Sequence, residues 1–357
     1  MDLMAEVRPG ANRYISGDGI LQELPLFINK FKNIAVITGV KSYEVFCEYY
    51  GKKIDYPTFV YDGSASDEDG QRLANEIKNA DAIIAIGGGR LLDTAKLTAE
   101  ILGSELIIIP TLISNCAPYT PITVVYTQKN HAFKRIGVSS KAIYVTLVDW
   151  KLLLKTPKDY FVAGIGDTLA KWYECEAITR HLKDSEKKAC VKLGIAAAKE
   201  IFNILLTNSG EALNALEKGK VTPAFGQTAD TIIALAGCVG GFAEKYGRIS
   251  GAHAVHNALS LIQETHEILH GTKVAYGILV QLAYTGDFAE IKTLIPRFKE
   301  LGLAVKLADL GIIADDNRLP SVAEFAAKSE ESFVYIDSEV TSDKVLKAME
   351  QLEVLND

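Results

Sequence analysis

Four of the six histidines in this chain of 357 residues lie close together, between residues 253 and 270. Imidazole nitrogens bind divalent metals and exchange protons near neutral pH, so this stretch is a candidate for metal or acid–base chemistry. On a helix, a spacing of three places His253 and His256 on one face, and a spacing of four places His266 and His270 on another. Two imidazoles from separate helices and one carboxylate would hold an ion and leave a position open for substrate. We therefore expect only some of the four to be ligands, with His266 exposed to solvent.

Asp167 is the candidate carboxylate, within the segment AGIGDTLAKWYECEA at residues 163–177. We expect a glycine-flanked turn followed by an amphipathic helix, so an alternative role for Asp167 is to cap the start of that helix. Lys171 follows one helical turn later. It could form an ordinary i,i+4 ion pair with Asp167, worth about 0.2–0.5 kcal/mol, or face the pocket and attract an anionic substrate.

A second candidate site is the glycine triplet Gly87, Gly88 and Gly89, which follows an apolar run and precedes a helical stretch. Without side chains, the backbone of such a turn can approach a pyrophosphate, whose charge the helix start favours. The spacing is not GxGxxG, and the glycines could serve only a tight turn. Asp93, further along the same stretch, could act at the cofactor or be an ordinary helix-start carboxylate.

These candidates lie in two halves with different sequence patterns. The first half alternates helical stretches with runs rich in Val and Ile, which predicts strands covered on both faces of a parallel, doubly wound sheet. Helical spacing dominates the second half. We expect an α/β nucleotide-binding domain over residues 1–155 and an all-helical metal- and substrate-binding domain over 156–357. The predicted strands are 33–39, 58–63, 81–89, 105–111, 122–127 and 142–149; the predicted helices include 68–79, 90–102, 165–183, 186–206, 227–244, 251–263, 271–285 and 318–331.

The composition excludes several classes of protein. The net charge is −7 and no long basic run is present, which argues against nucleic acid as a partner. No apolar run is long enough to span a membrane, and the first residues lack the layout of a secretory signal. The five cysteines are scattered, which favours reduced thiols. We expect a cytoplasmic protein that acts on a small molecule.

Four segments resemble the iron-containing alcohol dehydrogenase superfamily, in its glycerol dehydrogenase branch. They follow the patterns GGGxxxDTAK, GxGDxLAxxxE, HAxHN and HGxKVAxG, and they occur in the family's order. The resemblance implies a Rossmann-like dinucleotide-binding domain followed by an all-α domain, the dehydroquinate synthase-like fold. It also implies a homo-oligomer, because the family often forms assemblies from dimers to octamers.

The resemblance also implies roles for individual residues. The glycine triplet would bind the pyrophosphate of NAD or NADP, and Asp93 would orient the nicotinamide end. The implied ligands of one divalent metal (zinc, iron or nickel) are Asp167, His253 and His270. We assign His256 either to a substrate hydrogen bond or proton relay, or to support of a ligand. Thr111 and Lys134 are assigned to the cofactor, with a solvated strand-edge lysine as the alternative for Lys134.

Three departures from the family pattern bear on metal, substrate and cofactor. Iron-dependent members carry a fourth ligand, a histidine, at the position of Lys171; an ammonium group is a poor ligand, so zinc is favoured. Cys116 stands where glycerol dehydrogenases place an aspartate that contacts the polyol. With Lys171, this favours a substrate that carries a carboxylate. Gly39 stands where NAD-preferring members have an aspartate, and Lys41 follows, which favours NADP.

The favoured hypothesis is a metal-dependent, NAD(P)-linked oxidoreductase that interconverts a small hydroxy compound and its carbonyl form, with a 2-hydroxy acid and a 2-oxo acid as the expected pair. Lys171 and His256 are its candidate catalytic residues beside the metal. Glycerol dehydrogenase is the first alternative. A dehydroquinate synthase-like lyase would use a glutamate ligand and more basic residues, and a nucleotide-binding regulator without turnover would not need three metal ligands.

Overall fold

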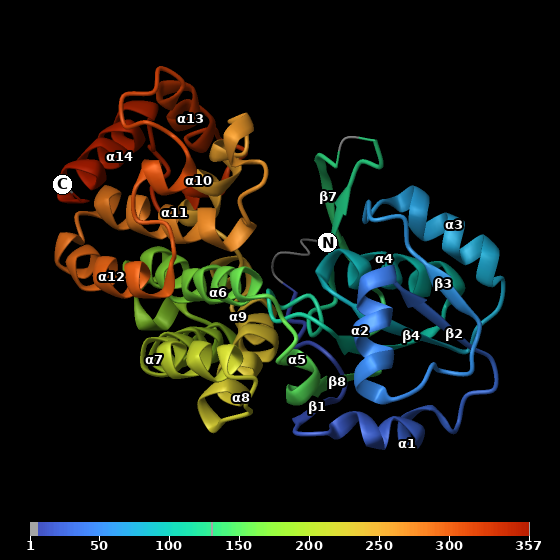
Figure 1. Cartoon of the computed structure of the whole chain (residues 1–357). Helices are drawn as coiled ribbons and strands as arrows, with labels where there is room; N and C mark the ends of the chain where they lie inside the picture. Colours follow the sequence, from blue (N-terminus) through green and yellow to red (C-terminus); the bar gives the residue numbers. More distant parts are fainter. Residues whose placement is uncertain (1–5, 130, 357) are drawn as a thin grey trace. The chain divides into compact units, whose positions relative to one another are not determined.

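The computed structural model describes residues 6–129 and 131–356, and the chain divides into two compact units (Figure 1). The sheet unit consists of Arg8–Lys158 and Asn214–Cys238. The helical unit contains Asp159–Leu213 and the residues from Val239 onward. The main difference from the predicted division at residue 155 concerns residues 214–238, which the prediction assigned to the helical domain.

The sheet unit is built on six parallel strands in the order β1-β8-β5-β4-β2-β3. From β2 the chain moves outward to β3, and from β4 it moves outward in the opposite direction to β5. The carboxyl ends of β2 and β4 therefore flank a topological switch point, where sheets of this kind bind ligands. The six strands are β1 (Tyr14–Gly17), β2 (Ile34–Thr38), β3 (Thr58–Val60), β4 (Ala82–Gly87), β5 (Glu105–Pro110) and β8 (Val145–Asp149).

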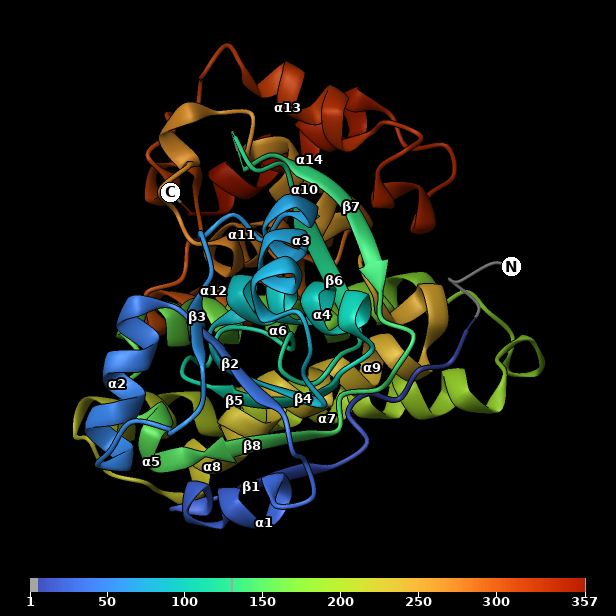
Figure 2. The same ribbon diagram turned by 90° about the vertical axis from the view of Figure 1, so that its right-hand side faces the viewer.

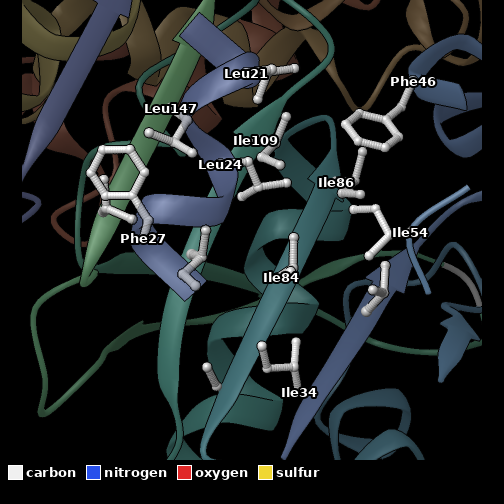
Figure 3. Packing of buried hydrophobic residues seen from close by; sticks show 14 of the residues in the cluster. Leu21, Leu24, Phe27, Ile34, Phe46, Ile54, Ile84, Ile86, Ile109 and Leu147 are labelled. Carbon is white, nitrogen blue, oxygen red and sulfur yellow. The ribbon is translucent and has the colours of Figure 1, made fainter. Parts of the chain in front are cut away.

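Both faces of this sheet are covered, as the continuous Val and Ile runs predicted. Ile84 and Ile86 of β4 lie in one core, together with Leu24 and Phe46 (Figure 3). The alternate residues of the same strand, Ile83 and Ala85, lie in a second core on the opposite face. The first core involves α1 (Leu24–Ile28), α2 (Val40–Tyr50) and α5 (Trp150–Leu153), and the second involves α3 (Asp67–Ile77) and α4 (Gly89–Leu102).

One predicted strand does not belong to the parallel sheet. The run predicted at 122–127 forms β6 (Ile122–Tyr126), which pairs antiparallel with β7 (Phe133–Val138) in a separate two-stranded sheet (Figure 2). Burial alternates along β6, as expected for a strand covered on one face only. Neither β7 nor β1 was predicted; four of the six residues of β7 are exposed, and its sequence FKRIGV has no clear apolar period.

Residues 214–238 belong to the sheet unit because of contacts made by α8 (Pro223–Asp230). Asp230 accepts hydrogen bonds from the Tyr14 hydroxyl at 2.7 Å and the Ser16 hydroxyl at 3.0 Å, both on the edge strand β1. A Cβ on Gly226 would lie 2.9 Å from the ring of Trp150, so α8 packs directly on that side chain. A π-helical turn, Thr231–Leu235, leads from α8 to α9 (Ala236–Phe242).

The regular structure of the helical unit is helical throughout its described part, as predicted. Two of its helices, α12 (Phe288–Leu301) and α14 (Ser342–Asn356), were not among those predicted. No helix in the described ranges is long and apolar enough to cross a membrane. All five cysteines lie in those ranges, and none forms a disulfide. The longer helices are α6 (Lys158–Thr179), α7 (Ala189–Glu217), α10 (Gly251–Leu259), α11 (His270–Thr285), α12 (Phe288–Leu301), α13 (Leu319–Ala326) and α14 (Ser342–Asn356).

Candidate active site

Asp167 lies inside α6 and not at its start. The helix begins at Lys158, so the predicted turn before Asp167 and its alternative role as a helix cap are wrong. The glycines serve a helix crossing instead. A Cβ on Gly166 would lie 2.6 Å from the carbonyl oxygen of Gly271, and one on Gly271 would lie 1.8 Å from that of Ala163. The backbones of α6 and α11 therefore touch, and this contact places Asp167 beside His270, the first residue of α11.

A second glycine contact positions α10 against α11. A Cβ on Gly277 would lie 2.3 Å from the carbonyl oxygen of Ala252, so these two backbones also meet directly. The Gln281 side chain of α11 accepts a hydrogen bond from the N–H of Ala252 at 3.0 Å. This contact holds His253, the next residue of α10, over the crossing of α6 and α11.

Asp167, His253 and His270 come together in the helical unit. One ligand atom from each residue lies within 4.8 Å of those of the other two. The Asp167 Oδ1 atom lies 3.4 Å from Nε2 of His253 and 3.2 Å from Nε2 of His270. Four-coordinate zinc, bonded at about 2.0–2.2 Å, separates its ligand atoms by about 3.3–3.6 Å, so this spacing fits a divalent ion. The His253 side chain is 10% exposed and that of His270 is 51% exposed, so the cluster is open on the His270 side.

Glu174, for which the sequence predicted no role, contacts the candidate ligand His253. Its Oε2 lies 2.9 Å from Nδ1 of His253, and its Oε1 accepts from the backbone N–H of Ser250 at 2.7 Å and of His253 at 3.0 Å. Because a carboxylate only accepts, Nδ1 of His253 carries a hydrogen, so a metal that displaces the other ring proton would bind at Nε2, which faces Asp167. The available signal was its spacing, since Glu174 follows Asp167 by seven residues and so lies on the same helix face.

The charges of this cluster shift its pKa values. Burial alone would lower the pKa of His253, but the charges of Glu174 and Asp167 outweigh burial and raise it to about 9. Burial would raise the pKa of Asp167, but His270 and His253 hold it well below its ordinary value. The pKa of Glu174 is likewise held down, against burial, by His253 and Lys171. Both carboxylates therefore stay ionised, as a dication requires.

The two predicted catalytic side chains make specific contacts near these ligands. Lys171 donates to the carbonyl oxygen of Arg248 at 2.7 Å and not to Asp167, so the simple i,i+4 ion pair is not formed. Nε2 of His256 lies 2.9 Å from Nδ1 of His270, which places His256 directly behind a candidate ligand. Burial lowers the pKa of His256 well below its ordinary value, so its ring is neutral.

His266 was predicted to share a helix face with His270, and this is wrong. His266 lies just after a 3₁₀ turn, Gln263–Thr265, and α11 begins only at His270. Its side chain is exposed, as expected, and Nε2 lies 3.1 Å from the carbonyl oxygen of Ser260.

The predicted cofactor residues Gly39, Gly87 and Thr111 lie at the carboxyl ends of three neighbouring strands, β2, β4 and β5. Gly88 is the N-cap of α4 and no side chain caps this helix start. Leu92 donates the hydrogen bond that closes the first turn, to Gly88 at 3.0 Å, so the N–H groups before it can face an anion. The position at the switch point and the uncapped helix start fit a dinucleotide pyrophosphate.

Packing also requires glycine in this turn. A Cβ on Gly88 would lie 2.8 Å from the Leu112 side chain, and one on Gly89 would lie 2.8 Å from the Asn115 amide. These glycines therefore serve a tight turn, and phosphate binding by the same residues stays a prediction.

Asp93 and Lys134 have protein partners. Asp93 is buried, forms an ion pair with Lys96 at 3.0 Å and accepts from the N–H of Val124 at 3.2 Å, which ties α4 to β6. Lys134 lies on β7 and pairs with Asp67 at 3.1 Å. Lys41 is exposed at the start of α2.

Comparison with known proteins gives the site its context. Residues 11–149 match the family model described as iron-containing alcohol dehydrogenase. Hydroxycarboxylate dehydrogenase A of Escherichia coli strain K12 is 36% identical over 296 residues, covering 82% of this chain and 81% of that protein. The chain belongs to the iron-containing alcohol dehydrogenase family. Glycerol dehydrogenase of Thermotoga maritima is 31% identical over 353 residues, covering 94% of both chains.

The fold agrees with membership of the iron-containing alcohol dehydrogenase family. The crystal structure of a probable glycerol dehydrogenase from Sinorhizobium meliloti 1021 superposes with a TM-score of 0.85 at 27% identity, covering 98% of this chain and 99% of that one. The chain is thus an oxidoreductase of the glycerol dehydrogenase branch, acting on a CH–OH group with NAD(P) and a divalent metal.

Cys116, the residue predicted to replace the polyol-binding aspartate of glycerol dehydrogenases, lies in the loop after β5. Its carbonyl oxygen accepts from the N–H groups of Tyr119 at 2.9 Å and Thr120 at 3.0 Å, which forms a turn. The Tyr119 ring fills the space that Gly10 and Gly237 leave open, since a Cβ on either would lie within 2.5 Å of it. The loop that carries Cys116 is therefore packed closely against other segments of the sheet unit.

Proposed function

We propose that this protein reduces a small 2-oxo acid to the 2-hydroxy acid, and catalyses the reverse reaction, with NADPH preferred over NADH and zinc as the metal. The observation that carries the proposal is the cluster of Asp167, His253 and His270, with Glu174 fixing the tautomer of one ligand. Two imidazoles and one carboxylate are a donor set that suits catalytic zinc.

The candidate ligands and the glutamate behind them would bind and orient the metal. Asp167, His253 and His270 would hold the ion, which when bound polarises a carbonyl or alcohol oxygen as a Lewis acid. Glu174 holds a hydrogen on Nδ1 of His253, so that Nε2 is the nitrogen left for the metal, and it adds a second negative charge behind that ring. The exposed side of His270 leaves room for a small substrate to reach the cluster.

The sheet unit would bind the dinucleotide, which supplies the hydride. The N–H groups at the start of α4 would bind the pyrophosphate next to Gly87, Gly88 and Gly89. Gly39, at the end of β2, places no carboxylate at the adenosine ribose, and the exposed Lys41 adds a cation nearby. Both features favour a ribose phosphate, and thus NADP.

Two side chains support a carboxylate-bearing substrate. Cys116 replaces a carboxylate with a thiol, which removes a negative charge that would repel an anion. Lys171 brings a positive charge close enough to Glu174 to lower the pKa of that carboxyl. A relative named hydroxycarboxylate dehydrogenase A supports the same choice. The relatives named glycerol dehydrogenase make glycerol the second candidate substrate.

The test is a reduction assay on zinc-loaded protein with NADPH or NADH, across a panel of 2-oxo acids and dihydroxyacetone. We expect 2-oxo acids with NADPH to give the highest kcat/KM, and the Lys41→Ala variant to lose NADPH preference while a Lys53→Ala control keeps it. Asp167→Asn should lose zinc and at least about a hundredfold in rate, with Asp159→Asn on the same helix as control. Unchanged turnover in Asp167→Asn would refute the site, and highest activity on dihydroxyacetone would favour the glycerol alternative.

A further inference from the structure

A line of hydrogen bonds leads from His270 away from the metal cluster to a carboxylate on another segment. Nδ1 of His270 lies 2.9 Å from Nε2 of His256, and Nδ1 of His256 lies 3.0 Å from Oδ1 of Asn257. The Asn257 amide nitrogen donates to Oε2 of Glu331 at 3.0 Å. Each member therefore contacts the next through a single pair of atoms.

The direction of these hydrogen bonds follows from the last member. A carboxylate can only accept, so Glu331 requires the NH₂ group of Asn257 to face it. The Asn257 oxygen then faces His256, which must carry its hydrogen on Nδ1 and accept at Nε2. His270 in turn must donate from Nδ1, which leaves Nε2 of a neutral His270 with a lone pair, as a metal ligand needs.

The opposite direction would leave acceptors facing each other. If His256 donated from Nε2, its Nδ1 lone pair would face the Asn257 oxygen at 3.0 Å. Turning the amide would only move the conflict, because its oxygen would then face the Glu331 carboxylate at 3.0 Å. One acceptor at the end of the line thus determines the hydrogen positions of both rings.

We propose that Asn257 and Glu331 are positioning residues for the metal site: together they set the tautomer of His256 and, through it, keep Nε2 of His270 available to the metal. The inference rests on the metal site of the proposed function. Neither residue belongs to the cluster of candidate ligands.

The fold holds Glu331 in place for this role. The next residue, Ser332, starts a 3₁₀ turn, Ser332–Tyr335, and its buried hydroxyl donates to the carbonyl oxygen of Ser250 at 2.6 Å. Ser250 directly precedes α10, which carries both His256 and Asn257. The segment that carries Glu331 is therefore anchored on the helix whose histidine it orients.

The first test needs no variant. Nitrogen-15 NMR of histidine-labelled, metal-free protein reports which ring nitrogen of each of the six histidines carries a hydrogen, with His256→Gln used for assignment. We expect His256 in the Nδ1–H form. A His256 ring with its hydrogen on Nε2 would overturn the proposal, whatever the enzymatic activity.

The second test compares zinc affinity, measured by competition with a chromogenic chelator. In Glu331→Gln the hydrogen bonds from Asn257 to His270 can run in either direction, because an amide can donate as well as accept. We expect His256 to populate both tautomers and zinc affinity to fall about tenfold. Glu330→Gln, an exposed neighbouring glutamate, is the matched control and should match the wild type. The double variant Asn257→Asp/Glu331→Gln has the same net charge as the wild type but places the carboxylate directly against Nδ1 of His256. It should restore the zinc affinity and the Nδ1–H tautomer of His256.

Equal zinc affinity and equal tautomer in Glu331→Gln and Glu330→Gln would refute the proposal, as would a double variant no better than Glu331→Gln. Failure of the proposed function gives a different result. In that case the wild type binds no zinc tightly, while the His256 tautomer is still read in the metal-free protein.

Discussion

At the scale of residues, the site is a set of charges arranged around one imidazole. His253 lies between Asp167 and Glu174, and the two carboxylates have different tasks. Asp167 faces the same space as the candidate metal-binding nitrogens, whereas Glu174 lies behind the ring and accepts its Nδ1 hydrogen. The chemistry of the cluster therefore depends on a residue that is not itself a candidate ligand.

This arrangement predicts the effect of Glu174→Gln. The amide can offer its NH₂ group to Nδ1 of His253, which moves the ring hydrogen to Nε2, where the metal should bind. We expect zinc affinity to fall about 10- to 100-fold, measured by chelator competition. Glu176→Gln, on the same helix, is the matched control. Equal affinities in the two variants would contradict the role given to Glu174.

The raised pKa of His253 predicts how the stability of the metal-free protein depends on pH. A folded-state pKa of about 9 lies above the ordinary value of 6.5, so protonated His253 stabilises the folded state fully below pH 6.5. This contribution is lost as the pH rises through 9. The difference in melting temperature between wild type and His253→Gln, measured without metal, should therefore shrink between pH 6.5 and 9.5. A difference that stays constant would show that the histidine is not protonated.

At the scale of elements, contacts between helix backbones determine the ligand positions. Gly166 and Gly271 let α6 touch α11, and Gly277 lets α10 approach α11. These three helices carry the three candidate ligands, one each. The distances within the cluster therefore depend on positions where a side chain would separate the helices.

Gly271→Ala tests this dependence. The added methyl group would lie 1.8 Å from a backbone oxygen, which cannot move without moving α6. We expect a loss of about 1–3 kcal/mol in the free energy of unfolding, together with weaker zinc binding. Gly210→Ala is the control, because it lies on an exposed part of α7 with nothing within 4 Å of the new Cβ. It should stabilise the protein by about 0.5–1 kcal/mol. Denaturant titration would measure both, and a stable Gly271→Ala protein with normal zinc affinity would contradict the argument.

At the scale of the whole molecule, the sheet unit needs a segment that comes late in the chain. Asp230 gives the Tyr14 and Ser16 hydroxyls their acceptor, and α8 covers Trp150. We expect a fragment of residues 1–155 to lack a cooperative thermal transition, measured by circular dichroism. The same fragment joined by a Gly/Ser linker to residues 214–238 should recover one. Cooperative melting of the short fragment would show that the predicted boundary at residue 155 defines a self-sufficient domain.

The sequence predicted what depends on local pattern. The runs around Ile84 and Ile108 identified the buried strands, and the motifs around Asp167 and His253 identified the candidate ligands. Prediction from the sequence was wrong where the local structure depends on a partner that is distant in the chain. Two glycines before Asp167 suggested a turn because their partner in α11 could not be seen, and β6 was placed in the main sheet because its pairing with β7 depends on a strand without an apolar period.

Glu174 accepts the backbone N–H groups of both Ser250 and His253, so a side chain of α6 supplies the cap that α10 lacks locally. The first turn of α10 and the orientation of its histidine ring thus share one pair of oxygen atoms. A zinc ion that immobilises the ring should also slow hydrogen exchange at these two amides. Removal of the metal should then fray the first turn of α10. Faster amide hydrogen exchange in that turn would report this change without any signal from substrate or cofactor.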